Sequence, residues 1–183
     1  MMEKQLAEIE RVLISKEEIE ARIKEVAAEL DAFYGEKTPI AICILKGSIM
    51  FYTDLLRAMK TSTSMEFMKV SSYGFGTTSS GKLSVGLDIQ SNIDGKDVLI
   101  IEDIIDSGNT MYALKKMLET RSPASIRVVT LLDKPARRVA DIVPDYVGFE
   151  IEDEFVIGYG LDYAEKYRDL PYVGILKRSV YEN

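Results

Sequence analysis

Short apolar runs recur along this chain, and each is followed by a polar turn or a helical pattern. Residues 40–45 precede the turn Lys46-Gly47-Ser48, residues 98–101 precede a turn rich in hydroxyls and glycine, and residues 126–132 form a third run. Strands that are apolar throughout are buried on both faces, as in parallel sheets covered by helices on both sides. The pattern therefore predicts an α/β fold with a central, mostly parallel sheet flanked by helices.

Four further features complete the expected order of elements. Ser15 and Glu18 form a capping box at the start of an amphipathic helix, and Ser48 is the expected N-cap of the helix after the first apolar run. Residues 71–82 are polar and glycine-rich, which is typical of a surface loop. After residue 147, short apolar pieces between glycines predict strands with irregular insertions.

The length and the charge limit the class of protein. The chain has 183 residues, 46% of them hydrophobic and 29% charged, so we expect residues 1–183 to form a single domain. The net charge of -7 argues against nucleic acid and membrane partners, because such surfaces attract a cationic patch. We expect neither a membrane span nor a secretion signal. The single Cys43 forms no intrachain disulfide, which indicates a reducing, cytoplasmic location.

Histidine is absent from the sequence. Its absence excludes Ser-His-Asp triads, Cys-His pairs and histidine-ligated zinc. A general base must then be a carboxylate, a lysine, a tyrosine or Cys43, and Cys43 lies inside an apolar run where a buried small hydrophobe is the ordinary outcome. The motifs of standard P-loops and of dinucleotide-binding turns are missing as well.

Residues 98–110 combine an apolar strand, three carboxylates and a hydroxyl-rich turn. The turn would start a helix, where backbone amides and the helix dipole favour a phosphate group. The adjacent Glu102 and Asp103 suit the hydroxyls of a sugar or a hydrated Mg²⁺. The alternative is a solvated strand end with a helix cap at Asp106 or Ser107.

Four ordered motifs carry a resemblance to a known family. They are Leu45-Lys46-Gly47-Ser48, Ser71-Ser72-Tyr73-Gly74, the segment 98–110, and Lys134 followed by residues 147–170. Together they resemble the type I phosphoribosyltransferases, and in particular the hypoxanthine-guanine members. The resemblance implies the fold of that family, in which the central sheet is joined by a small hood region from both chain termini and by a flexible lid loop at about residues 71–83.

The resemblance assigns one stretch of the chain to 5-phosphoribosyl pyrophosphate (PRPP). Glu102 and Asp103 would contact the ribose hydroxyls, partly through Mg²⁺, and Asp106 would be the catalytic base that accepts the proton from N7 of the purine. The 5′-phosphate would lie in the turn of Asp106, Ser107, Gly108, Asn109 and Thr110. Ser107 replaces a threonine of many relatives and Asn109 a lysine of some, so the affinity for phosphate can differ.

The resemblance also assigns the purine site. Lys134 would bind O6, Phe155 would stack on the base, and the backbone of Val156 would pair with its edge. Asp162 would join the purine contacts and would ligate a second Mg²⁺. Taken alone, Lys134 is equally a surface lysine, Phe155 is more often a core residue, and Asp162 is more often a surface charge.

The remaining assignments concern pyrophosphate and the lid. Lys46 and Gly47 would form the pyrophosphate loop with a non-proline cis peptide, and Arg168 would neutralise the leaving pyrophosphate unless it is an ordinary surface charge. Ser72 and Tyr73 would belong to the lid, for which a disordered loop is the alternative.

The implied activity is purine salvage, in which Mg²⁺-dependent transfer from PRPP to N9 of hypoxanthine or guanine gives IMP or GMP and pyrophosphate. Xanthine is a further candidate base, whereas adenine would meet Lys134 donor to donor. We expect a homodimer or homotetramer. A rival class is a regulator that senses PRPP and binds RNA or DNA, against which the acidic charge and Asp106 both argue.

Overall fold

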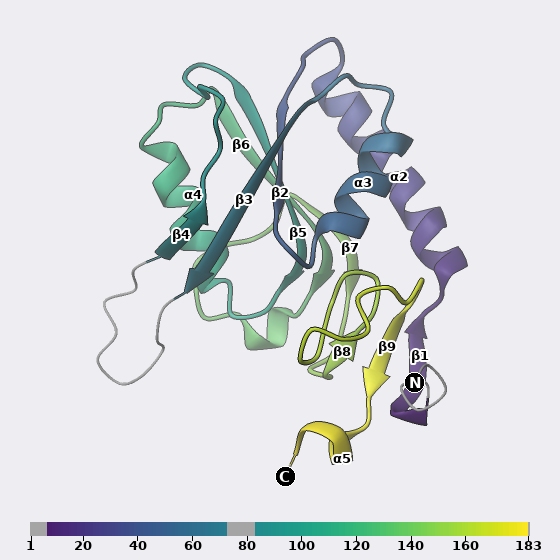
Figure 1. The fold of residues 1–183 in the computed structure, drawn as a ribbon. Helices are drawn as coiled ribbons and strands as arrows, with labels where there is room; N and C mark the ends of the chain where they lie inside the picture. The colour runs from purple at the N-terminus through teal and green to yellow at the C-terminus, as the bar shows by residue number, and fades with distance from the viewer. Residues whose placement is uncertain (1–6, 73–82, 183) are drawn as a thin grey trace.

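The computed structural model of this protein describes residues 7–72 and 83–182, which form a larger and a smaller β-sheet (Figure 1). The larger sheet has six strands in the order β4-β3-β2-β5-β6-β7. Their bounds, in that order, are Leu83–Leu87, Ser64–Ser72, Ile40–Ile44, Asp97–Ile105, Ser125–Asp133 and Tyr146–Glu150. Every neighbouring pair is parallel except β3 and β4, which confirms the predicted sheet.

Helices cover both faces of this sheet (Figure 1). One hydrophobic cluster joins α2 (Lys16–Tyr34) and α3 (Ile49–Ala58) to the first face, and a second joins α4 (Asn109–Glu119) to the other. Side chains of a strand point alternately to the two faces. In β5, Leu99 and Ile101 therefore pack in the first cluster, and Val98 and Ile100 in the second. This double burial explains why the central strands are apolar throughout.

The two predicted N-caps differ in outcome. Ser15 and Glu18 form the expected capping box of α2. Ser48 occupies the N-cap position of α3, but the prediction that its side chain caps the helix is wrong. Its backbone is already helical, with φ -74° and ψ -6°, so its hydroxyl turns back and donates to the carbonyl of Ile44 at 2.6 Å. The same hydroxyl lies 3.2 Å from Sγ of Cys43.

The smaller sheet combines both ends of the chain. It has three strands in the order β1-β9-β8, and both pairs are antiparallel. Their bounds are Ile9–Ile14 for β1, Val173–Leu176 for β9 and Val156–Ile157 for β8. The short α5 (Arg178–Tyr181) follows β9, and a 3-10 turn η1 (Pro135–Arg137) follows β6. The predicted short strands with irregular insertions are therefore confirmed.

The predicted lid lies mostly outside the described residues. Ser72 ends β3 and Leu83 begins β4, and these two positions are paired in register. Tyr73 belongs to residues 73–82, which the structure does not describe, so the lid stays a prediction. Across the described ranges, no helix combines the length and the apolar character that a membrane crossing requires.

Candidate active site

Three loops meet at one edge of the central sheet, because β2, β5 and β6 run parallel and end there. They carry Lys46, Asp106 and Lys134. Strand β5 is longer than the sequence predicts: it continues through Ile105, since its ladder with β6 extends to the pair Ile105 and Asp133. Glu102 consequently lies within the strand rather than in the turn after it.

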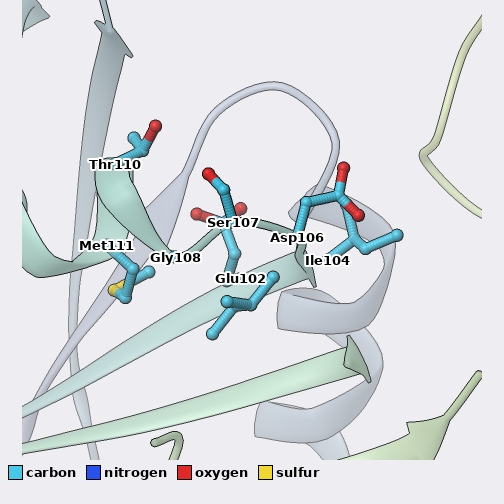
Figure 2. A pocket seen from close by; sticks show the side chains of 8 residues that line it. Glu102, Ile104, Asp106, Ser107, Gly108, Thr110 and Met111 are labelled. Carbon is cyan, nitrogen blue, oxygen red and sulfur yellow. The ribbon is translucent and has the colours of Figure 1, made fainter. Parts of the chain in front are cut away.

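A pocket of about 280 Å³ opens at the end of β5 and the start of α4 (Figure 2). Its lining consists of Glu102, Ile104, Ile105, Asp106, Ser107, Gly108, Thr110 and Met111. The side-chain oxygens of Asp106, Ser107 and Thr110 point to the same side of the turn (Figure 2). Gly108, with φ of 80°, is the N-cap residue of α4, so no side-chain hydrogen bond caps the start of this helix. Hydroxyls and first-turn amides of a helix make this a suitable phosphate site.

Glu102 and Asp103 concentrate negative charge beside this pocket. Burial raises the pKa of both carboxyls, and the charge of Asp103 raises the pKa of Glu102 further. Asp103 also approaches the neighbouring loop, because a Cβ atom at Gly47 would lie 1.5 Å from its Oδ2. Buried neighbouring carboxylates of this kind favour a bound cation.

The two carboxylates are compatible with the predicted Mg²⁺. Among the described residues, no group of three or more candidate ligands is placed to hold a metal ion. Mg²⁺ is usually held by one or two carboxylates together with substrate phosphates and water. Glu102 and Asp103 match that requirement. Asp162, predicted to ligate a second ion, forms no such group with them in the described part of the chain.

The predicted pyrophosphate loop is tightly enclosed. The peptide bond between Leu45 and Lys46 is cis. Gly47 is buried, and its carbonyl faces Gly160, where a Cβ atom would lie 1.9 Å from Gly47 O. Gly160, with φ of 100°, is required here by its backbone conformation and by this contact. The side chain of Lys46 is exposed and forms an ion pair of 3.0 Å with Glu165.

Arg168 lies on the same side of the site as Lys46. Its guanidinium donates to the carbonyl of Gly160 at 2.7 Å and pairs with Asp162 at 2.7 Å and Glu165 at 3.6 Å. The amide of Glu165 donates to the other carboxylate oxygen of Asp162 at 2.8 Å. Asp162 is therefore fully engaged in this conformation, and its role as a metal ligand or purine contact stays a prediction.

Lys134 is not a surface lysine. Only 5% of the residue is exposed. Its ammonium donates to the carbonyl of Glu154 at 2.7 Å and lies 3.5 Å from Oδ1 of Asp106 and 3.8 Å from Oδ1 of Asp153. Oδ1 of Asp106 is buried, and no described residue makes a hydrogen bond to it. The structure therefore brings together Lys134, the predicted contact to the purine, and Asp106, the predicted general base.

Phe155 and Val156 are placed by the smaller sheet. The carbonyl of Phe155 accepts from the amide of Leu176 at 2.9 Å, and Val156 pairs in register with Ile175. Because bonding alternates along a strand and β8 is an edge strand, the N–H and C=O of Val156 point away from β9. The ring of Phe155 stacks on Tyr181 with centroids 4.7 Å apart.

Sequence reasoning missed Arg138, whose guanidinium contacts the carbonyls of Asp106 and Ile105 at the turn after β5. Its partner Asp133 is buried and directly precedes Lys134. A carboxylate at the end of an apolar strand was the available signal for Asp133. Arg138 stands in a basic stretch next to Arg137, and nothing in the local pattern separates one from the other.

Comparison with known proteins decides the family. The family described as the phosphoribosyl transferase domain matches residues 13–164. The chain belongs to the phosphoribosyl transferase family. Within it, the chain is 53% identical to the hypoxanthine-guanine phosphoribosyltransferase of Bacillus subtilis, covering 96% of this chain and 98% of that protein. It is 46% identical to the protein of the same name from Streptococcus thermophilus, with 99% of each chain covered.

A solved structure agrees with the sequence relatives. The crystal structure of a hypoxanthine phosphoribosyltransferase from Staphylococcus aureus superposes with a TM-score of 0.94 at 48% identity, covering 98% of this chain and 97% of that chain. The expected type I phosphoribosyltransferase fold is confirmed, with its mostly parallel sheet flanked by helices.

Proposed function

We propose that this phosphoribosyltransferase transfers the 5-phosphoribosyl group of PRPP to N9 of hypoxanthine or guanine, giving IMP or GMP and pyrophosphate in purine salvage. The observation that carries the proposal is the buried ammonium of Lys134 at 3.5 Å from the carboxylate of Asp106, next to a pocket suited to phosphate. The names of the close bacterial relatives support it.

Lys134 and Asp106 would contact different atoms of the purine: Lys134 would bind O6, and Asp106 would accept the proton from N7. Lys134 donates to a 6-oxo group and so rejects a 6-amino group, because a donor facing a donor leaves both unpaired. Oδ1 of Asp106 is buried and faces Lys134, whereas 46% of the Asp106 side chain is exposed. The carboxylate, through its other oxygen, would accept the N7 proton as N9 attacks the ribose carbon and pyrophosphate leaves.

The rest of the purine site would come from the smaller sheet. The outward-facing N–H and C=O of Val156 would pair with the edge of the base. Phe155, which stacks on Tyr181 and packs edge-to-face with Tyr163, would contact the base with its ring. The carbonyl of Glu154 already fixes the ammonium of Lys134 beside this strand. Asp162 would join these contacts after it separates from Arg168.

The ribose phosphate and the pyrophosphate would bind on the side of Asp106 that is opposite to the purine. The turn 106–110 would hold the 5′-phosphate through its amides and hydroxyls. Lys46, the Gly47 amide and Arg168 would hold the pyrophosphate, and Glu165 would then give up its ion pairs with both cations. Ser72 and Tyr73 would serve the lid that excludes water.

Glu102 and Asp103 would hold Mg²⁺, with Asp162 as the ligand of a second ion. When bound, Mg²⁺ would supply positive charge that neutralises the leaving pyrophosphate. The fit rests on two neighbouring buried carboxyls whose pKa values are raised by burial, an arrangement that a cation would stabilise.

We propose three features of the whole chain. Residues 1–183 form one domain in which the smaller sheet is the hood. A homodimer or homotetramer is supported by exposed apolar side chains on α3, β3 and β4, namely Ile49, Met50, Met65, Val85 and Leu87. The single buried Cys43 supports the cytoplasm as the compartment.

A spectrophotometric assay with PRPP, Mg²⁺ and each of hypoxanthine, guanine, xanthine and adenine tests the proposal. Turnover of hypoxanthine or guanine with release of pyrophosphate is expected, together with its loss when Mg²⁺ is chelated. PRPP binding without turnover of any base would indicate a sensor instead. Turnover of adenine above the 6-oxopurines would overturn the assigned specificity.

Lys134→Met removes the ammonium and keeps an unbranched side chain of similar reach. We expect the preference for hypoxanthine over adenine, as a ratio of kcat/KM, to fall about tenfold to a hundredfold. Lys166→Met, which changes an exposed lysine, is the matched control. An unchanged preference in Lys134→Met would remove Lys134 from base recognition.

A further inference from the structure

Arg138 reaches the back of the turn after β5, and only 15% of its side chain is exposed. Its Nε donates to the carbonyl of Asp106 at 3.1 Å, and one terminal nitrogen donates to the carbonyl of Ile142 at 2.6 Å. The other terminal nitrogen lies 3.5 Å from the carbonyl of Ile105 and pairs with the carboxylate of Asp133. One guanidinium therefore bonds four acceptors.

The next carbonyl of the turn faces the same way. The carbonyl of Ser107 accepts from the amides of Val139 at 2.9 Å and Ala140 at 3.0 Å. The carbonyls of Asp106 and Ser107 are thus bonded to the segment that begins at Arg138, and the carbonyl of Ile105, which accepts from the amide of Lys134 at 3.0 Å, is also within reach of Arg138.

This arrangement determines where the amides point. In a planar trans peptide unit, the N–H points opposite to the C=O. Binding the carbonyls of residues 105–107 from behind therefore turns the N–H groups of residues 106–108 forward, toward the pocket. Within the described residues, the N–H groups of Ser107 and Gly108 have no hydrogen-bond partner. Successive forward-facing amides form a nest for an anion.

Close packing holds the turn against Arg138. A Cβ atom at Gly108 would lie 2.8 Å from Cδ of Arg138 and 2.7 Å from Cγ2 of Ile142. Asp133, which is 8% exposed, fixes the guanidinium from the end of β6. The planar fork of arginine fits several acceptors at once, which a lysine ammonium cannot reproduce.

We infer that Arg138, oriented by Asp133, is a positioning residue of the phosphate site. It binds the carbonyls of the turn on the side away from the pocket, so that the amides of the turn face the 5′-phosphate of PRPP. The inference rests on the proposed function for the identity of the anion. Arg138 lies behind the turn and does not touch the substrate, so it acts through the affinity for PRPP.

Arg138→Ala, Arg138→Lys and Asp133→Asn test this role, with Arg121→Ala as control because Arg121 pairs with Asp88 at the far end of α4. We expect the KM for PRPP to rise about tenfold or more in Arg138→Ala, and the KM for hypoxanthine to stay within about twofold. Arg138→Lys and Asp133→Asn should show smaller rises. Ethylguanidinium at millimolar concentration should partly restore PRPP affinity in Arg138→Ala.

Titration calorimetry with PRPP and Mg²⁺, without base, separates this inference from the proposed function. A parent protein that neither binds PRPP nor transfers it would overturn the proposed function. A parent that does both, with Arg138 variants that match its PRPP affinity, would overturn the inference alone. If Arg138→Ala does not fold, Arg138→Lys decides: a folded lysine variant with parental PRPP affinity contradicts the role, and weakened affinity with parental hypoxanthine KM supports it.

Discussion

Asp106 directly follows β5. Its carboxylate oxygen Oδ1 is buried and lies 3.5 Å from the ammonium of Lys134. Asp106→Asn keeps the shape and removes the basic oxygen, so we expect kcat to fall about a hundredfold to ten-thousandfold. PRPP affinity by calorimetry should change by less than about threefold. Asp153→Asn, at 3.8 Å from the same ammonium, is the matched control. Parental kcat in Asp106→Asn would exclude it as the base.

Glu102 makes the stability of the metal-free protein depend on pH. Its pKa is raised above the ordinary 4.5, chiefly by burial and then by Asp103. A group whose pKa is raised on folding stabilises the fold at low pH, and this stabilisation is lost as pH rises through the folded value. Relative to low pH, the Glu102 carboxyl therefore costs stability increasingly as pH rises above 4.5, and the cost at pH 8 with EDTA exceeds that at pH 5.

Glu102→Gln removes this cost. We expect the variant to be more stable than the parent by about 0.5–2 kcal/mol at pH 8 with EDTA, the range typical of a single stabilising substitution. The advantage should shrink as pH falls and vanish near pH 4.5, the ordinary value. Urea unfolding across this pH range measures it, and the exposed Glu36→Gln serves as control. A pH-independent difference would contradict the explanation.

At the scale of elements, α5 packs against Phe155 of the proposed purine site. Tyr181 stacks on Phe155 with an interplanar angle of 24°, and the carbonyl of Val180 accepts from the hydroxyl of Tyr163 at 3.2 Å. Aromatic pairs contribute about 0.5–1.5 kcal/mol beyond burial. We therefore expect Tyr181→Ala to raise the KM for hypoxanthine roughly twofold to tenfold, with the KM for PRPP unchanged. Tyr181→Phe, which keeps the ring, should match the parent, and equal KM values for all three proteins would contradict the role.

Elements that follow from local periodicity could be predicted, and contacts between distant segments could not. The apolar runs that became β2, β5 and β6 are visible in the sequence because burial on both faces leaves no polar alternation. The hydroxyl turn before α4 was equally visible. The end of β5 was not, since its last residues are ordered by pairing with β6.

Parts of the candidate site also depend on contacts between distant segments, which local sequence patterns do not predict. The family resemblance identified Asp162 and Arg168, but their mutual ion pair depends on the backbone of residues 158–168. The outward direction of the Val156 backbone follows from the register of β8 on β9, which no local pattern encodes. Arg138 was missed because its partners come from two strands and a turn.

At the scale of the whole molecule, the candidate site joins the two sheets. Gly47, from a loop of the larger sheet, packs against Gly160, which follows the strand β8 of the smaller one. Tyr159 strengthens this junction by donating to Asp54 of α3 at 2.6 Å. The predicted PRPP contacts likewise come from both sides, with Asp103 on the larger sheet and Arg168 on the segment after β8. Bound PRPP would therefore connect the two parts.

This geometry predicts that PRPP with Mg²⁺ stabilises the whole fold. A ligand at about one hundred times its Kd adds roughly 2.7 kcal/mol, which for a chain of this length raises Tm by roughly 5–10 °C. Differential scanning fluorimetry should show this shift, and EDTA should abolish most of it. Arg168→Ala should lose much of the shift because it removes the proposed pyrophosphate contact, whereas Arg121→Ala should keep it. A full shift in Arg168→Ala would mean that PRPP binds without the segment after β8, and that the two sheets are not linked through the ligand.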